Sequence, residues 1–396
     1  MVQRIQKTKI FLGFLPHMIT DIYPSFIIGM IPILAAKLGL SLFLIGILTS
    51  VNFISANLSQ PVFGFLSDKY GIKYFLILGP LFASVFISLL GIAPTYWVIL
   101  IFLFFGNLGV AAIHPPTAAI ANLFGGRRKG LANSLVSFGG ALGFSFGSIF
   151  IIFIIERFGM MYTPLAAIPG LLLAAFMIKF APNISISNTS SHKVHFIDSL
   201  KKVKKPKITL LLMIIFVSYC REMMNITLLT FMPLYFTGQG IKLINFGYIF
   251  MAFIIIGGIG GLIAGYYSDK IKKRTIVIQV LLFVSIPLVF TIFIVPVNIS
   301  IIFFILAGFF SISTLPLCTR LAQDIFPGNV SLASSFSIGV AAGSAALTLI
   351  LIGRIADIVG MVTVIRYVTI FPLAACMLLF FFPLIKAKSS IIAVKE

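Results

Sequence analysis

Residues 64–73 read GFLSDKYGIK, and residues 265–274 read GYYSDKIKKR. The second stretch begins 201 residues after the first and keeps the same Ser-Asp-Lys core. The same shift aligns other residues without a gap, among them Asp21 with Glu222, Pro32 with Pro233, Gly39 with Gly240 and Gly46 with Gly247. The chain therefore consists of two copies of a unit of about 200 residues. Because both copies contribute equivalent surfaces, we expect the functional site to lie between them.

The composition indicates a membrane protein. Hydrophobic residues make up 60% of the chain, charged residues make up 10%, and the mean hydropathy is +1.16. Six apolar runs in each copy reach about 20 residues, which is enough to cross a bilayer. The sequence predicts an all-α membrane protein with two pseudo-symmetric six-helix bundles, at residues 1–181 and 208–396. A basic cytoplasmic linker at residues 182–207 would join them.

The net charge of +20 is unevenly distributed along the chain. If the N-terminus is inside, five of the 29 Lys and Arg residues fall in outer segments, namely Lys37, Arg157, Lys242, Arg354 and Arg366. This asymmetry follows the positive-inside rule and predicts that both termini are cytoplasmic. The positive charge therefore indicates lipid headgroups rather than nucleic acid as the partner.

Several kinds of chemistry have no support in the sequence. The three cysteines, Cys220, Cys318 and Cys376, lie within predicted spans and lack CxxC or metal-ligand spacing, so we expect neither a disulfide nor a metal site. We find no nucleotide-binding loop and no catalytic constellation. The expected protein is not an enzyme, has no cofactor, and draws its energy from an ion gradient.

Ionisable residues inside the predicted spans are the first functional candidates, because a charge in the bilayer is costly. His17 and Asp21 lie four residues apart and share a helix face. We expect Asp21 to bind and release a proton, with His17 as its relay and Glu222 as the second candidate. Arg221 and Glu222 are neighbours, about 100° apart around the helix, and are predicted to point in different directions.

A second group of polar residues is predicted to face a central cavity. His114 precedes two prolines that bend its helix, and Arg320 stands four residues before Asp324. Asn107 and Asn225 add two amides within the spans. If Arg221 also faces the cavity, it could hold an anion together with Arg320. The alternative for Arg320 is an intrahelical ion pair with Asp324 at the membrane edge.

Small residues at a spacing of four form stripes on two predicted helices. They are Gly139, Gly143 and Gly147 on the fifth helix, and Gly257, Gly261 and Gly265 on the eighth. Such stripes let helix backbones approach closely. We expect the two stripes to face each other as surfaces that move during function. A static packing role is the alternative.

The doubled loop of the opening lines resembles the loop signature of the major facilitator superfamily of transporters. This resemblance implies that helices 1, 4, 7 and 10 line a central cavity. It also implies that the Asp68 carboxylate engages residues 329–331 and 127–129 and clamps the cytoplasmic side. The second copy lacks the later glycine, so Asp68 should matter more than Asp269. The expected gating residues are Gln60, Gly64, Asp68, Gly71, Lys73, Arg127, Arg128, Asp269, Arg274 and Asp324.

A longer set of motifs is similar to the fosmidomycin-resistance family of exporters. It comprises His17 with Asp21, Gln60-Pro61, His114-Pro115, residues 130–140 and residues 322–328. The resemblance implies a proton-coupled antiporter that exports a drug or small metabolite by alternating access. It would act as a monomer in the inner membrane of a prokaryote. The alternatives are a proton symporter for a small organic anion and, from another class, a membrane-embedded sensor with a transporter fold.

Overall fold

The computed structural model describes residues 6–183, 205–271, 274–325 and 336–394. Within these ranges the chain is helical and contains no strand, and twelve helical stretches are long and apolar enough to cross a membrane. The predicted all-α class and the twelve spans are confirmed. The seventh span covers Ile208–Gly238, and its helix begins three residues earlier, at Lys205, within the predicted linker. The rest of that linker, from residue 184, lies outside the described residues.

The first half of the chain forms six spans. In chain order, its α-helices are α1 (Lys7–Asp21), α2 (Phe26–Leu38), α3 (Leu42–Asn57), α4 (Gln60–Tyr70), α5 (Ile72–Ser88), α6 (Tyr96–Phe124), α7 (Lys129–Phe158) and α8 (Ile168–Phe180). Helices α1 and α2 belong to one span that a 3₁₀ turn at Tyr23–Ser25 interrupts, and α3 and α4 form the next span. Pro24 explains the interruption, since proline cannot donate a helical hydrogen bond.

The second half repeats this order. Its helices are α10 (Lys205–Gly238), α11 (Leu243–Ile271), α12 (Arg274–Ile292), α13 (Val297–Ile312), α14 (Thr314–Ile325), α16 (Ala341–Val359) and α17 (Met361–Val394). The turns between helices also match across the repeat. Gly39 and Gly240 have φ values of 61° and 86°, and Gly159 and Gly360 have φ values of 97° and 89°. These left-handed conformations favour glycine, so the duplication is visible in the backbone as well as in the sequence.

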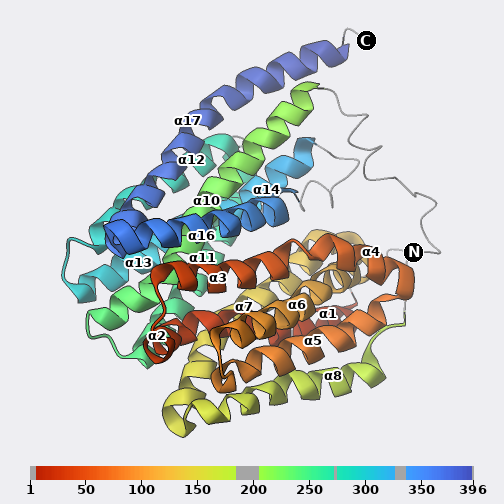
Figure 1. Ribbon diagram of the computed structural model, residues 1–396. Helices are drawn as coiled ribbons and strands as arrows, with labels where there is room; N and C mark the ends of the chain where they lie inside the picture. Colours follow the sequence, from red (N-terminus) through yellow and green to blue (C-terminus); the bar gives the residue numbers. More distant parts are fainter. Residues whose placement is uncertain (1–5, 184–204, 272–273, 326–335, 395–396) are drawn as a thin grey trace.

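The two halves meet at one end of the molecule and diverge at the other. In Figure 1 they separate toward the side where the N- and C-terminal labels lie. We call this side the terminus end and the opposite side the far end. One hydrophobic core at the far end joins both halves, with Phe26 and Ile31 beside Phe231, Met232 and Leu349. At the terminus end each half instead has its own separate cores. The halves are therefore closed at the far end and open at the terminus end.

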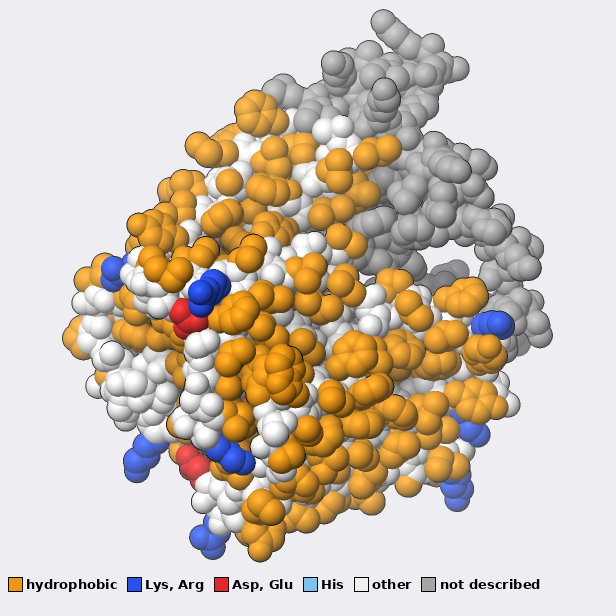
Figure 2. Space-filling model, in the orientation of Figure 1, with side chains coloured by type: hydrophobic (Ala, Val, Ile, Leu, Met, Phe, Trp, Pro, Cys, Tyr) orange, Lys and Arg blue, Asp and Glu red, His pale blue; other side chains and the backbone are white. Residues whose placement is uncertain are grey.

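The outer surface is that of a protein embedded in lipid. Figure 2 shows a broad hydrophobic belt, with Lys, Arg, Asp and Glu side chains gathered toward the two ends. Large apolar side chains such as Leu172, Leu351 and Phe380 are more than half exposed. A water-soluble protein rarely leaves so much contiguous apolar surface uncovered. The belt is the surface that acyl chains would cover.

Candidate functional site

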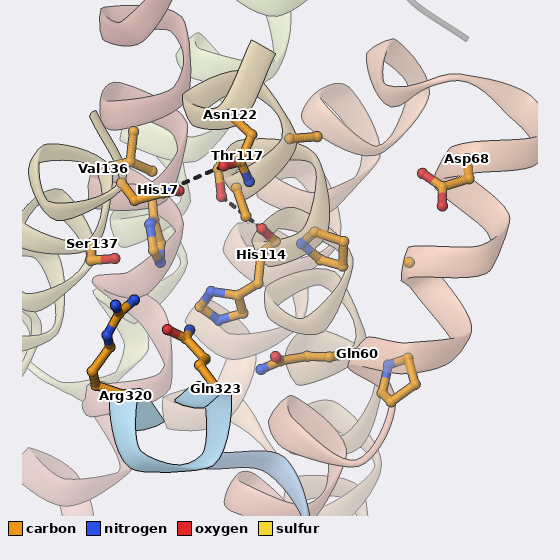
Figure 3. Close-up of a pocket in the computed structure, with 16 residues that line it drawn as sticks. His17, Gln60, Asp68, His114, Thr117, Asn122, Val136, Ser137, Arg320 and Gln323 are labelled. Carbon is orange, nitrogen blue, oxygen red and sulfur yellow. Dashed lines mark hydrogen bonds between the residues drawn. The ribbon is translucent and has the colours of Figure 1, made fainter. Parts of the chain in front are cut away.

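A cavity of about 820 Å³ occupies the space between the diverging halves. It lies in the half of the molecule nearest the termini, and Figure 3 shows side chains from both halves around it. Its lining residues are His17, Gln60, Pro61, Gly64, Asp68, His114, Pro115, Thr117, Ala118, Ala119, Asn122, Asn133, Val136, Ser137, Arg320 and Gln323. This set contains no Phe, Leu, Ile, Met, Tyr or Trp. The described lining therefore combines polar side chains with small apolar ones, although the rest of the chain is rich in large apolar side chains.

A cluster of three ionisable side chains lies at the wall of this cavity. The Oδ2 atom of Asp21 is 3.3 Å from Nε2 of His17, and its Oδ1 atom is 3.8 Å from Nε2 of His114. The two imidazole rings meet edge to face, with centroids 4.8 Å apart. The Asp21 side chain is only 12% exposed, whereas that of His114 is 26% exposed. Both histidines line the cavity, whereas Asp21 is not among its lining residues.

The local backbone explains how this cluster forms. Helix α1 ends at Asp21 because the 3₁₀ turn at Pro24 follows, which places the carboxylate at a break in the span. On α6, Thr117 follows the two prolines and donates its hydroxyl to the carbonyls of Ile113 and His114, each at 3.0 Å. These bonds satisfy backbone acceptors in the turn that carries the imidazole.

Gly140 on α7 is a part of the site that the sequence interpretation missed. A Cβ atom added at Gly140 would lie 2.6 Å from Nε2 of His17 and 2.7 Å from Oδ2 of Asp21. Any larger residue would therefore displace one of the two side chains. The sequence signal was the Gly139-Gly140 doublet, of which Gly139 was interpreted as helix packing and residues 130–140 as part of the resemblance to an exporter family.

The same three side chains could hold a proton or one metal ion. Their ligand atoms all lie within 4.8 Å of one another, which is close enough for one metal ion. A metal-bound imidazole usually donates its other nitrogen to an acceptor. The Nδ1 atom of His17 is buried without a hydrogen-bond partner among the described residues. Oδ1 of Asp21 is likewise without one, so an acceptor that a proton could occupy is already present.

The repeat equivalent of Asp21 has a different environment. Glu222 on α10 accepts a hydrogen bond from Nη2 of Arg221 at 2.6 Å. The prediction that these neighbours point in different directions was wrong, because both side chains are long enough to curve toward each other. Arg221 is 2% exposed and is not among the residues that line the cavity. Glu222 thus pairs with a guanidinium, whereas Asp21 lies beside two imidazoles.

At the mouth of the cavity, Asp324 on α14 joins two arginines. Its Oδ1 is 3.3 Å from Nε of Arg320, and its Oδ2 is 2.5 Å from Nη1 of Arg274. The intrahelical pair considered from the sequence is present, and Arg274 from the second loop adds a further partner. Arg320 also lines the cavity and its side chain is 59% exposed. Of the two arginines expected to hold an anion, Arg320 is therefore the one that reaches the cavity.

The remaining predicted cavity residues lie deeper in each bundle. Asn107 donates to Oδ1 of Asn52 at 2.9 Å, and Asn225 accepts from the Ser311 hydroxyl at 2.7 Å. Both asparagines are buried and neither lines the cavity. Each asparagine connects two helices within its own half.

Several predicted gating residues lie along the cavity. Gln60, Gly64 and Asp68 line it, and Gly71, with φ 97°, ends α4 just beyond them. Lys73 lies in the first turn of α5, and Arg127 and Arg128 lie in a 3₁₀ turn before α7. The expected Asp68 contact at residues 329–331 lies outside the described residues, as do the side chains of Arg127 and Asp269.

The two glycine stripes do not face each other, so that prediction was wrong. The stripe of Gly139, Gly143 and Gly147 packs on α1 and the turn after it, where added Cβ atoms would meet the carbonyl oxygens of Phe14, Met18 and Ile22. Gly257 faces Ile312 on α13, and Gly261 faces Pro316 on α14. An added Cβ at Gly265 would meet nothing within 4 Å. Each stripe therefore packs within its own half.

Comparison with known proteins identifies the family. Residues 11–337 match the Major Facilitator Superfamily. The chain belongs to this superfamily. It is 26% identical to the fosmidomycin resistance protein of Escherichia coli (strain K12) over 92% of this chain and 90% of that relative. Across 43% of the chain and 44% of the relative, it is 33% identical to the multi-drug resistance efflux pump PmrA of Streptococcus pneumoniae.

Solved structures support the same fold. A bacterial homolog of the human lysosomal transporter Spinster, in an inward-facing and unoccupied conformation, has a TM-score of 0.80 at 15% identity. The match covers 96% of this chain and 98% of that one. The nucleoside transporter NupG gives a TM-score of 0.74 at 13% identity. This major facilitator chain is thus a membrane transporter with exporter-like relatives, and the predicted family is confirmed.

Proposed function

We propose that this major facilitator transporter works by alternating access and exports a small polar solute in exchange for protons. The cluster of Asp21 with His17 and His114 supports the proton coupling. It places a nearly buried carboxylate within 3.8 Å of two imidazoles that line the cavity. An imidazole can accept a proton on one ring nitrogen and donate from the other, so it can pass a proton between water and a carboxylate. No cofactor is needed, because the proton gradient supplies the energy.

The distribution of Lys and Arg indicates which side of the membrane the open end faces. Lys and Arg concentrate on the side of the termini, so we assign the terminus end to the cytoplasm and the far end to the outside of the inner membrane of a prokaryote. The structure then corresponds to an inward-open state. In this assignment the protein acts as a monomer, with both termini in the cytoplasm.

The polar groups of the cavity favour a hydrophilic substrate. Its described lining offers amides, hydroxyls, imidazoles, one guanidinium and the Asp68 carboxylate, but no large apolar side chain. Sites for lipophilic ligands are lined mainly by hydrophobic and aromatic groups. The named relatives are a fosmidomycin resistance protein and a multi-drug resistance efflux pump, so we propose a polar drug or small metabolite for this chain. Arg320 in the cavity supports a second candidate function, proton symport of a small organic anion.

Purified protein in proteoliposomes tests this function. Candidate solutes are first selected by thermal shift, and their flux is then measured under an imposed pH gradient. We expect solute movement opposite to the proton gradient, together with proton movement detected by an entrapped pH dye. Solute flux that does not depend on the pH gradient would contradict proton coupling. Solute flux in the same direction as the protons would favour the symporter.

Arg320→Gln should raise the KM for an anionic substrate about tenfold. The KM for a neutral substrate should stay almost unchanged. A guanidinium in the cavity binds carboxylate or phosphonate oxygens through charge-assisted hydrogen bonds, and losing one costs about 1.5–3 kcal/mol. Arg274→Gln is the matched control, because Arg274 shares Asp324 but does not line the cavity. Equal effects of both variants would show that the ion-pair network, not substrate contact, is responsible.

Asp68→Asn should slow transport up to about fivefold without lowering the unfolding temperature. A carboxylate beside a helix N-terminus and cations contributes up to about 1 kcal/mol, and we assign this contribution to the closed cytoplasmic side. Asp269→Asn should have a smaller effect, because its loop lacks an equivalent of Gly71. Flux assays and thermal unfolding of the two variants check this prediction. Equal defects, or none in Asp68→Asn, would count against the clamp.

A further inference from the structure

At the far end, two carboxylates bind backbone amides of the opposite half. The Oδ1 and Oδ2 atoms of Asp357, near the end of α16, accept from the amides of Leu42 and Phe43 at 2.7 and 3.1 Å. Oε1 of Glu156, near the end of α7, accepts from the amide of Ile244 at 3.3 Å. All three hydrogen bonds therefore cross from one half of the molecule to the other.

The two contacts are equivalent under the internal repeat. The shift of 201 residues that aligns the loop stretches also carries Glu156 to Asp357 and Phe43 to Ile244. In each case a carboxylate at the end of one helix caps the first turn of a helix in the other half. Because the contact occurs in both repeats, it is a feature of the repeated architecture rather than a chance surface contact.

Helix starts are suitable targets for such a contact. The first amides of a helix have no partner within the helix, and the helix dipole favours a negative charge beside them. The bond between Asp357 and Leu42 requires the ends of α3 and α16 to touch. It must break when the halves separate at the far end.

Glycines bring the paired helices close enough for these bonds. A Cβ atom added at Gly46 on α3 would lie 2.9 Å from the carbonyl oxygen of Leu349 on α16. At Gly247 on α11 it would lie 3.2 Å from Cα of Ile149 on α7. Gly46 and Gly247 are themselves repeat equivalents. The close helix approach and the carboxylate cap are therefore duplicated together.

We propose that Glu156 and Asp357 form a paired latch that holds the far end closed in the inward-open state. The inference rests on alternating access in the proposed function. Asp357 is the stronger member, because it caps two amides while Glu156 caps one. The Ser41 hydroxyl oxygen also accepts from the amide of Leu44, so three successive amides at this helix start have acceptors.

Distance measurements between the halves test the latch without any substrate. Spin labels are placed by Lys37→Cys and Ile294→Cys at the far end, in protein whose native cysteines are replaced by Ala, and distances are measured by pulsed electron resonance in nanodiscs. Asp357→Ala should raise the ratio of far-end-open to far-end-closed molecules roughly fivefold, the usual effect of losing one helix cap. Glu156→Ala should raise it less, and the double variant should combine both effects.

Two further variants keep the interpretation clear. Asp357→Asn retains one of the two acceptor oxygens and should restore part of the closed population, which shows that capping and not merely charge is responsible. Arg354→Ala alters an exposed residue one turn earlier on α16 and should leave the distances unchanged. Unchanged distances in both Asp357→Ala and Glu156→Ala overturn the proposal, as does an equal change in Arg354→Ala. Because these distances need no gradient, a failed latch is distinguishable from failed proton coupling.

Discussion

Asp21→Asn should abolish solute transport driven by a pH gradient while substrate binding persists. Asn resembles the protonated carboxyl group in shape but cannot release a proton. The variant is therefore fixed in the state that the proton-loaded transporter visits. We expect binding, measured by thermal shift, to stay within about twofold of the wild type, and exchange of internal for external solute to continue. Full proton-driven transport by Asp21→Asn would move the coupling role to another residue.

Glu222→Gln is the matched comparison for Asp21→Asn, because the two carboxylates are repeat equivalents. Glu222 is bound by Arg221, which is buried. Removing the negative charge leaves the guanidinium without its counter-charge, and such losses cost about 3–5 kcal/mol in buried pairs. We therefore expect Glu222→Gln to lower the unfolding temperature more than it weakens coupling. The opposite ranking of the two variants would indicate that the second half carries the proton.

Gly143→Leu should destabilise the protein by roughly 3 kcal/mol or more, because it forces α7 away from α1. An added Cβ at Gly143 already overlaps the Met18 carbonyl, and backbone cannot move aside as a side chain can. Gly143→Ala should show a weaker form of the same loss. Unfolding in a detergent titration, followed by tryptophan fluorescence from Trp97, measures the effect.

The control for the glycine prediction is Gly265→Ala. Its added Cβ meets nothing within 4 Å, and alanine is the better helix former, so stability should stay the same or rise slightly. Gly261→Leu should be tolerated better than Gly143→Leu, because its neighbour is a proline ring at 3.4 Å rather than a carbonyl oxygen. Comparable losses in all these variants would indicate a general intolerance of larger residues in the bundle.

The sequence was sufficient for the fold and for part of the site. Twelve apolar runs and a doubled loop predict two six-helix bundles, since span length and internal repetition are properties of the chain alone. The spacing of four placed His17 and Asp21 on one helix face, and the structure adds His114 from a different helix. Periodicity gives the face of a helix but not the neighbour that this face meets.

The same limit explains the wrong expectations. The stripe of Gly139, Gly143 and Gly147 was correctly identified as a surface for close approach, but its partner proved to be α1 rather than α11. Helix geometry separates the Cβ directions of Arg221 and Glu222, yet their flexible side chains still meet. The caps by Glu156 and Asp357 depend on which helix ends touch, and no local sequence pattern records that.

The open cavity also has a consequence for the water that the transporter carries through its cycle. At about 30 Å³ for each molecule of liquid water, a volume of about 820 Å³ corresponds to some 20–30 waters. Closing the terminus end around a small solute must expel most of them. An osmolyte too large to enter the cavity raises the free energy of the hydrated open state and favours the closed one. The working rate of this protein should therefore depend on osmotic pressure on the side where the cavity opens.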